Sequence, residues 1–498
     1  MEQAADADAG AKTGANAGAD SADTGAAGAH PPLIVDLDGT LLRTDMLHEA
    51  LTVHLGANPL DLLRMPGRLK AGKAGFKRWL AGEVTPDIET LPLNQDVVAR
   101  IETARSAGRR VELVTASDQS YADKIAAHLG LFDAAHGSDG TRNLGGQNKA
   151  DFLVERFGKG GYDYIGDSKA DLPVWASART ALVVGKSADL PVSAQGSVEP
   201  VPGAGSKKAM IKAMRPHQWL KNALIFVPAL AAGQFDLATL AMALLAFACF
   251  SLIASSVYII NDILDLGSDR RHPRKCKRPF AAGDVPIKDG LILAAGLFVT
   301  AFLAAIVFAP VAFVVVLAVY YALTFGYSLI LKRKSVLDIC TLAGLYSIRV
   351  VAGGAACAIY LSPWLLAFSM FVFLSLAAVK RQAEMVDLLN TDPKRKTGRP
   401  YEVDDLPVIR SIAMSAGYAA VLVLALYIQS QTAIEQYAVP EAFWMACPIL
   451  LYWLTRMVMV THRGGMSDDP IVFALRDKTS WVVVGLCFLA AVIAKVGI

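Results

Sequence analysis

The chain has 498 residues, of which 54% are hydrophobic, and its formal net charge is +3 at pH 7. This length exceeds one ordinary domain, and this apolar content excludes a wholly soluble protein. The six cysteines form no Cys-x-x-Cys pair, so neither a disulfide framework nor a zinc site is indicated. The near-neutral charge, with basic residues gathered in loops between apolar spans, argues against nucleic acid as a partner.

Residues 1–30 are almost all Ala, Gly, Asp and Thr. Such a segment cannot bury enough surface to offset the entropy of ordering, so we expect a disordered tail. It has neither a basic start nor an apolar core segment, which argues against a secretory signal and leaves the next domain in the cytosol.

Residues 31–190 alternate short apolar runs with amphipathic stretches, the pattern of a doubly wound α/β domain with a parallel sheet. Four runs are expected to be strands: 33–37, 111–114, 162–165 and 181–184. Ligands bind beyond the carboxyl ends of such strands, and polar motifs stand there after the first, second and third runs. A largely helical, basic insertion at about 44–92 is expected to cap this edge, although its amphipathic character also fits a membrane-surface helix.

The polar motifs resemble those of the haloacid dehalogenase family of phosphotransferases. The turn Asp36-Leu37-Asp38-Gly39-Thr40 offers a nucleophilic carboxylate, Asp36, and a second one, Asp38, able to protonate a leaving oxygen. The resemblance implies that Thr115 holds the transferring phosphoryl oxygens and that Lys149 neutralises their charge. It further implies a Mg²⁺ site with the carbonyl of Leu37 and the metal residues Asp36, Asp38, Asp167 and Asp171. A degenerate domain kept as a scaffold is the alternative.

Residues 191–206 are rich in Pro, Gly and small residues and are expected to form a linker to a second domain at 207–498. We expect that domain to be all-α and polytopic, with about nine membrane spans. The apolar segments lie near 219–234, 237–260, 289–309, 311–331, 336–358, 363–379, 411–429, 439–460 and 480–497. Loops that hold Lys and Arg alternate with loops that hold none, which places the N-terminus in the cytosol and the C-terminus outside.

Four polar residues follow the uncharged stretch 237–260: Asn261, Asp262, Asp265 and Asp269. At ~100° per residue they share one face of a continuing helix. Mg²⁺ is usually held by one or two carboxylates together with substrate phosphates. The basic residues that come next would attract a phosphorylated substrate, and those we expect to bind it are Arg271, Lys275 and Arg278.

The run Asn-Asp-x-x-Asp-x-x-x-Asp resembles the first signature of the UbiA superfamily of membrane transferases. Its continuation His272-Pro273-Arg274-Lys275, closing with Arg278-Pro279, looks more like the decaprenyl-phosphate phosphoribosyltransferase branch than the aromatic prenyltransferases. Similarity to that branch begins near Arg215. The resemblance implies a UbiA fold. It also implies functional residues: catalytic Asp262 and Asp265, a Mg²⁺ site on Asp262, Asp265 and Asp269, and substrate contacts from Lys221 and Asn261.

The stretch after the fourth span departs from the superfamily, in which a second Asp-x-x-x-Asp motif is common. Here Lys332-Arg333-Lys334 precedes a single aspartate, Asp338. A site for two phosphorylated partners needs such cations, so Lys332, Lys334 and Asp338 are expected to contact substrate.

Arg349 shares a helix face with Asp338 inside an apolar span, and an intramembrane arginine is functional by default. We expect it to bind phosphate, with an ion pair to Asp338 as the alternative. Lys380 is a further candidate ligand, unless it only pairs with Glu384 four residues on.

We therefore predict a bifunctional enzyme of the bacterial cytoplasmic membrane, dependent on Mg²⁺, with both sites in the cytosol. Its membrane domain would transfer 5-phosphoribose from phosphoribosyl diphosphate (PRPP) to a polyprenyl phosphate. The N-terminal domain would then remove the 5-phosphate and leave polyprenyl-phosphoryl ribose. The alternatives are an aromatic prenyltransferase, which leaves the phosphatase without a substrate, and a transport or lipid-binding domain with a scaffold partner. The oligomeric state and the lipid's chain length stay open.

Overall fold

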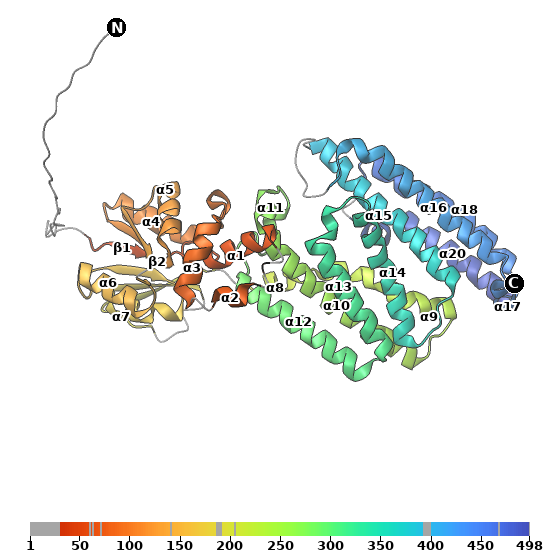
Figure 1. The fold of residues 1–498 in the computed structure, drawn as a ribbon, viewed down its shortest axis with the longest axis horizontal. Helices are drawn as coiled ribbons and strands as arrows, with labels where there is room; N and C mark the ends of the chain where they lie inside the picture. Colours follow the sequence, from red (N-terminus) through yellow and green to blue (C-terminus); the bar gives the residue numbers. More distant parts are fainter. Residues whose placement is uncertain are drawn as a thin grey trace, which may run out of the picture.

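The structure is a computed structural model that describes residues 30–58, 61, 64–69, 72–139, 142–185, 192–203, 206–391, 400–466 and 469–497. Figure 1 shows an α/β body and a helical body lying end to end, with helix α1 between them. The tail expected at 1–30 lies outside the described residues except for His30.

The α/β body is built on a sheet of six strands in the order β3-β2-β1-β4-β5-β6. All neighbouring strands are parallel, which confirms the predicted fold class. The strands are β1 (Leu33–Val35), β2 (Val111–Asp118), β3 (Ala134–Ser138), β4 (Asp163–Gly166), β5 (Thr180–Val184) and β6 (Ser197–Val201). Strand β6 falls inside the stretch expected to be a linker, and its edge position tolerates Pro200, which has no amide hydrogen to donate.

Helices cover both faces of this sheet. They are α4 (Gln95–Ser106), α5 (Gln119–Leu129), α6 (Gln147–Phe157) and α7 (Leu172–Ser177). Along β1, Leu33 and Val35 enter one hydrophobic core and Ile34 enters the other, because successive strand side chains point to opposite faces. Burial on both faces explains why β1 is apolar throughout, and the first polar residue, Asp36, follows its carboxyl end.

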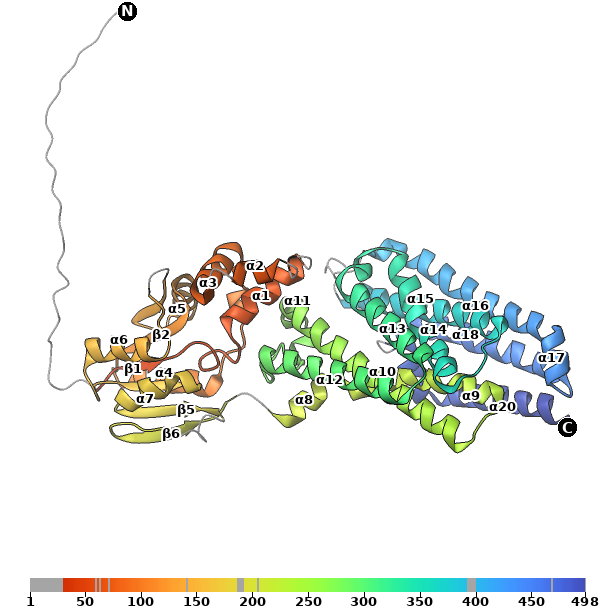
Figure 2. The ribbon, with the colours of Figure 1, turned by 60° about the horizontal axis from the view of Figure 1, so that its bottom comes forward.

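The insertion predicted to be helical consists of α1 (Met46–Ala57), α2 (Met65–Leu69), α3 (Gly72–Glu83) and the 3₁₀ turn η2 (Ile88–Thr90). Asp45 caps α1 by accepting hydrogen bonds from the backbone N–H groups of Leu47 and His48. Figure 2 shows α1 reaching from the α/β body toward α11 (Leu266–Arg271) of the helical body. From α3, Lys77 donates a 3.0 Å hydrogen bond to the carbonyl of Ala116, which follows Thr115 at the sheet edge.

The helical body contains, among the described residues, eight helices long and apolar enough to cross a membrane. They are α10 (Leu237–Leu264), α12 (Ile287–Phe308), α13 (Val311–Leu329), α14 (Leu337–Cys357), α15 (Pro363–Thr391), α16 (Leu406–Ile428), α18 (Ala446–His462) and α20 (Lys478–Val496). The most buried is α14, with 61% of its apolar window inside the protein, so α14 is the central helix of the bundle.

The first of the nine expected spans has a different form. It is a 3₁₀ helix, η5 (Pro216–Phe226), continued by α9 (Val227–Ala232). With rises of ~2.0 Å and ~1.5 Å per residue, the two pieces together extend about 31 Å, close to the thickness of a bilayer core. In Figure 2, α8 (Lys207–Ala213), which precedes η5, lies close to the α/β body, and α9 lies farther from that body. Gly353 of α14 permits the close approach of η5, because a Cβ there would meet the carbonyl oxygen of Ile225 at 2.0 Å.

Two candidate active sites

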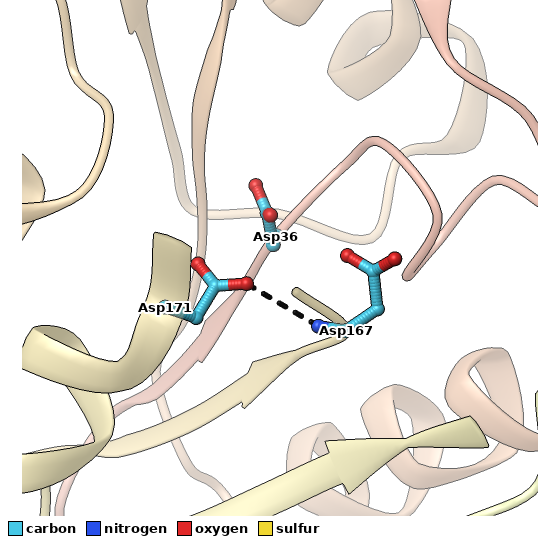
Figure 3. Close-up of side chains that lie close together, drawn as sticks. All are labelled: Asp36, Asp167 and Asp171. Carbon is cyan, nitrogen blue, oxygen red and sulfur yellow. Dashed lines mark hydrogen bonds between the residues drawn. The ribbon is translucent and has the colours of Figure 1, made fainter. Parts of the chain in front are cut away.

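Three carboxylates converge at the carboxyl edge of the sheet. Asp36 follows β1, Asp167 follows β4, and Asp171 ends the 3₁₀ turn η3 (Lys169–Asp171). Each offers an oxygen, and these oxygens all lie within 4.8 Å of one another (Figure 3). Among the described residues this is the group spaced to share one ion, and hard carboxylate oxygens suit Mg²⁺.

The loop after β1 can come this close to Asp167 because Gly39 has no side chain. Its φ of +73° lies in the left-handed region, and a Cβ there would sit 2.1 Å from an oxygen of Asp167. The next residue, Thr40, donates a 3.3 Å hydrogen bond to the same carboxylate.

Asp38 lies outside this group of three, although we expected it among the metal residues. Its carboxylate accepts hydrogen bonds from the backbone N–H of Met46 at 2.7 Å and from the Ser117 hydroxyl at 2.6 Å. The Thr115 hydroxyl lies 3.4 Å away. The start of α1 and Ser117 therefore hold Asp38 apart from the three carboxylates that are spaced to share an ion.

Lys149 enters the same site from α6 and is almost fully buried. Its ammonium donates to Asp36 and to the Tyr164 hydroxyl, both at 2.8 Å, and lies 3.6 Å from Asp171. Tyr164 in turn donates to Asp171 at 2.7 Å. No motif singles out Tyr164, because an aromatic residue in an apolar strand is expected to belong to the core.

Burial and mutual repulsion raise the pKa values of these carboxyl groups. Burial raises the pKa of Asp36 to about 6, against the lowering effect of Lys149. It raises the pKa of Asp38 to about 7, with a further contribution from Asp45. It raises the pKa of Asp167 to about 8, with repulsion from Asp36 and Asp171 adding to it. Carboxylates crowded in this way favour a divalent cation, which stabilises their charged forms.

In the helical body, the aspartate motif stands where α10 ends and α11 begins. Asp262 accepts hydrogen bonds from Arg215 and Arg278, and Arg278 also donates to Asp269 at 2.6 Å. Lys332 reaches both Asp265, at 3.0 Å, and Asn261, at 3.2 Å. The expected motif residues therefore form two groups, Asp262 with Asp269 around Arg278 and Asn261 with Asp265 around Lys332.

The motif aspartates do not meet the spacing that unites Asp36, Asp167 and Asp171. Arginine and lysine side chains bind their oxygens instead. Carboxylate oxygens of this kind suit Mg²⁺, and the basic side chains beside them suit phosphate oxygens.

A second polar cluster lies inside the bundle around Asp469, the residue that caps α19 (Pro470–Arg476). Its carboxylate is 2.5 Å from the ammonium of Lys221 and 3.5 Å from that of Lys380, and it accepts a 3.2 Å hydrogen bond from Tyr346. Sequence reasoning missed Asp469, which stands in a loop after α18 with no motif around it. The signal was its place before Pro470, a residue favoured at the first position of a helix.

Arg349 is buried on α14 beside this cluster. It donates hydrogen bonds to the side-chain oxygen of Asn222 at 2.8 Å, to the Tyr320 hydroxyl at 3.0 Å and to the Leu345 carbonyl. All these partners are neutral. The alternative of an ion pair between Arg349 and Asp338 is wrong.

Asp338 has other partners, namely Arg381 at 2.5 Å and the Tyr327 hydroxyl at 2.8 Å. Arg381 also pairs with Glu384, whereas Lys380 lies 3.5 Å from Asp469. Asp338 is fully buried.

The remaining predicted ligands lie on the surface. Arg271 pairs with Asp87 of the N-terminal insertion at 2.7 Å. Lys275 and Lys334 are exposed and form no ion pair with any described residue. The structure thus buries Lys221 and Arg349 in the bundle, with Lys380 beside them, and places Arg278 and Lys332 on the motif aspartates. It leaves Arg271, Lys275 and Lys334 exposed.

The UbiA prenyltransferase family matches residues 223–476, and haloacid dehalogenase-like hydrolases match residues 33–175. A protein of Sinorhizobium fredii called "Uncharacterized protein y4nM" is 36% identical over 471 residues, 93% of this chain and 91% of that protein. The decaprenyl-phosphate phosphoribosyltransferase of Mycolicibacterium smegmatis is 35% identical over 305 residues, 59% of this chain and 94% of that enzyme. A solved UbiA homologue of Archaeoglobus fulgidus, bound to DMAPP and Mg²⁺, covers 56% of this chain and 98% of its own at 14% identity, with a TM-score of 0.45.

The relative from Sinorhizobium fredii aligns across both bodies, so the fused arrangement recurs outside this protein. The eight long apolar helices and the family match together describe a multi-pass membrane protein. This chain belongs to the UbiA prenyltransferase family and carries a haloacid dehalogenase-like domain at its N-terminal end.

Proposed function

We propose that the membrane domain transfers 5-phosphoribose from phosphoribosyl diphosphate to a polyprenyl phosphate, and that the N-terminal domain then removes the 5-phosphate. The observation that carries the first step is the surplus of buried cations beside the aspartate motif. Around Asp469, one carboxylate faces two lysines, and Arg349 has neutral partners. A buried positive excess is costly unless an anion enters, and both proposed substrates carry phosphate.

In the transfer step the chain's own residues hold the two substrates. Mg²⁺, bound by Asp262, Asp265 and Asp269, would neutralise the departing diphosphate. Arg278 and Lys332, which pair with these aspartates, would take over phosphate oxygens as the carboxylates turn to the ion. The C1–O bond to diphosphate breaks and a lipid phosphate oxygen bonds to C1. Because that phosphate is already ionised at neutral pH, no general base is required.

The hydrolytic step uses the carboxylates at the sheet edge. Asp36 would attack the 5-phosphate, with Lys149 at 2.8 Å neutralising charge, and Mg²⁺ held by Asp36, Asp167 and Asp171 would orient the phosphoryl group. Asp38 gives its proton to the departing ribose oxygen. It then takes a proton from the water that hydrolyses the aspartyl phosphate, which returns both residues to their starting state.

Both sites are proposed to face the cytosol of a bacterium at its cytoplasmic membrane. Helix α11, which opens the basic stretch after α10, lies beside α1 of the N-terminal domain, which supports this orientation (Figure 1). The fusion keeps the phosphatase near the lipid product at an effective concentration of roughly millimolar. We take residues 31–201 as the phosphatase domain, extended by β6, and 207–498 as the transferase domain.

The experiment is a lipid-labelling assay with the purified full-length protein, Mg²⁺, ribose-labelled phosphoribosyl diphosphate and decaprenyl phosphate. We expect label in the lipid fraction. Asp262→Asn should abolish it, while hydrolysis of a soluble phosphate ester by the N-terminal domain continues. If the protein instead joins a polyprenyl diphosphate to an aromatic acid and leaves phosphoribosyl diphosphate intact, the proposal is wrong.

A further inference from the structure

The helical insertion of the N-terminal domain is docked on the membrane domain. Three pairs at this contact are exposed or weak. Asp87 binds Arg271 at 2.7 Å, the Gly56 carbonyl accepts a hydrogen bond from Arg333 at 3.1 Å, and Arg43 lies 3.7 Å from Asp284. Such surface pairs contribute little to affinity, because water and salt screen them.

One pair at the contact is different, because it is buried on both sides. Glu49 of α1 and Arg270 of α11 have side chains only 1% and 5% exposed. Both terminal nitrogens of Arg270 donate to the Glu49 carboxylate, at 2.8 and 2.6 Å. Thr44 donates a third hydrogen bond to Glu49 at 2.6 Å. The polar groups of both side chains have hydrogen-bond partners, and the bidentate geometry fixes the orientation of Arg270 relative to Glu49 as well as their distance.

Arg270 is connected to the aspartate motif in two ways. It directly follows Asp269 in α11, a helix of only six residues. Its third guanidinium nitrogen also donates to the carbonyl of Ala281 at 3.2 Å. Three residues before Ala281 stands Arg278, the side chain that bridges Asp262 and Asp269. The position of Arg270 therefore sets both sides of the Asp269–Arg278 contact.

Glu49 is also near the phosphatase site, to which α1 is joined by backbone groups rather than by the Glu49 carboxylate. It lies in the first turn of α1, whose opening residue Met46 donates its backbone N–H to Asp38. The backbone N–H of Gly39 donates to the carbonyl of Thr44, which ties the catalytic loop to the same helix start. One short helix thus touches Asp38 at its beginning and Arg270 one turn later.

We propose that Glu49, a residue of the phosphatase domain, is a positioning residue of the transferase site, acting through Arg270. This inference rests on the proposed transfer reaction and adds to it that the insertion is a docking element rather than a free lid. Without the carboxylate, the Arg270 guanidinium would be buried and unpaired. It would have to move toward water, and α11 would carry Asp269 with it.

The test compares Glu49→Gln with Asp87→Asn, which removes a carboxylate from the exposed docking pair beside it. Steady-state transfer is measured on the full-length protein, varying each substrate and Mg²⁺ separately. Glu49→Gln should lower kcat/KM for phosphoribosyl diphosphate by between about tenfold and a hundredfold, the scale of a ~1 Å misplacement. The KM for the lipid and the hydrolysis of p-nitrophenyl phosphate should stay near wild type. Asp87→Asn should transfer like wild type.

A double variant separates positioning from lost stability. If a lone buried charge causes the displacement, Glu49→Met combined with Arg270→Met should transfer faster than Glu49→Gln alone. Wild-type transfer by folded Glu49→Gln would overturn the inference. A loss of both activities in proportion to lost folded protein would overturn it as well. A different result would overturn the proposed function itself, namely that the wild-type protein transfers nothing from phosphoribosyl diphosphate.

Discussion

Replacing Arg349 by methionine should lower transferase activity while leaving the stability of the fold nearly unchanged. Methionine fills much of the volume of arginine, so the variant removes the charge while leaving only a small cavity. It also removes three hydrogen bonds to neutral partners on Asn222, Tyr320 and Leu345. These bonds contribute about 1 kcal/mol each. Burying a guanidinium with no carboxylate partner costs several kcal/mol, so the two effects roughly cancel.

The expected melting temperature of Arg349→Met is therefore within a few degrees of wild type. Activity should respond differently, since the substrate phosphate would lose a charge-assisted contact of about 2 kcal/mol, which corresponds to roughly a 30-fold lower kcat/KM for that substrate. The assay is lipid labelling at varied concentrations of each substrate, with thermal unfolding of the same samples. Lys288→Met, which removes an exposed charge on α12, is the matched control. Unchanged kinetics together with a large loss of stability would refute the phosphate-binding role.

Three further predictions follow from the contacts of single residues. Asp38→Asn should slow ester hydrolysis by about 10² to 10⁴-fold while lipid labelling continues, and equal rates would contradict its role as the acid. The raised pKa values of Asp36 and Asp167, about 6 and 8, mean that the folded metal-free protein holds protons more tightly than the unfolded chain. Its stability should therefore fall as pH rises from about 4 to 8, and Mg²⁺ should raise the melting temperature more at pH 8 than at pH 5. A shift independent of pH would contradict this linkage. Asp469→Asn should lower the melting temperature and weaken phosphate binding, because Lys221 loses its only carboxylate partner among the described residues. Wild-type values for both quantities would refute a role for Asp469 in the site.

The α/β fold and the carboxylates at its edge were predictable because local chemistry determines them. An apolar run that ends in Asp36 marks a buried strand and the place where it meets solvent. The same reasoning failed for β6, since Ser197–Val201 is short, contains proline and lies on the edge, where little apolar surface is needed. Asp38 was assigned to the metal from its neighbours in sequence, but the N-terminus of α1 determines its direction.

In the membrane domain the sequence located the spans and the aspartate motif but not the partners. Helix periodicity places Asp338 and Arg349 on one face, yet Arg381 from α15 takes Asp338 and leaves Arg349 to neutral groups. Asp469 is distant in sequence from the lysines that it pairs with. Pairings of this kind depend on which helices pack against one another, and the residues next to each charged group in the sequence do not determine that.

Phosphoribosyl diphosphate labelled in both the ribose carbon and the 5-phosphate shows whether the two sites act in succession on one lipid. The lipid product of the wild-type protein should carry the ribose label and lack the phosphate label. The product of Asp36→Asn should carry both in equal amounts, because an amide cannot form the aspartyl phosphate. The two sites do not act in succession if the wild-type lipid keeps its 5-phosphate through prolonged incubation while a soluble ester is hydrolysed in the same tube.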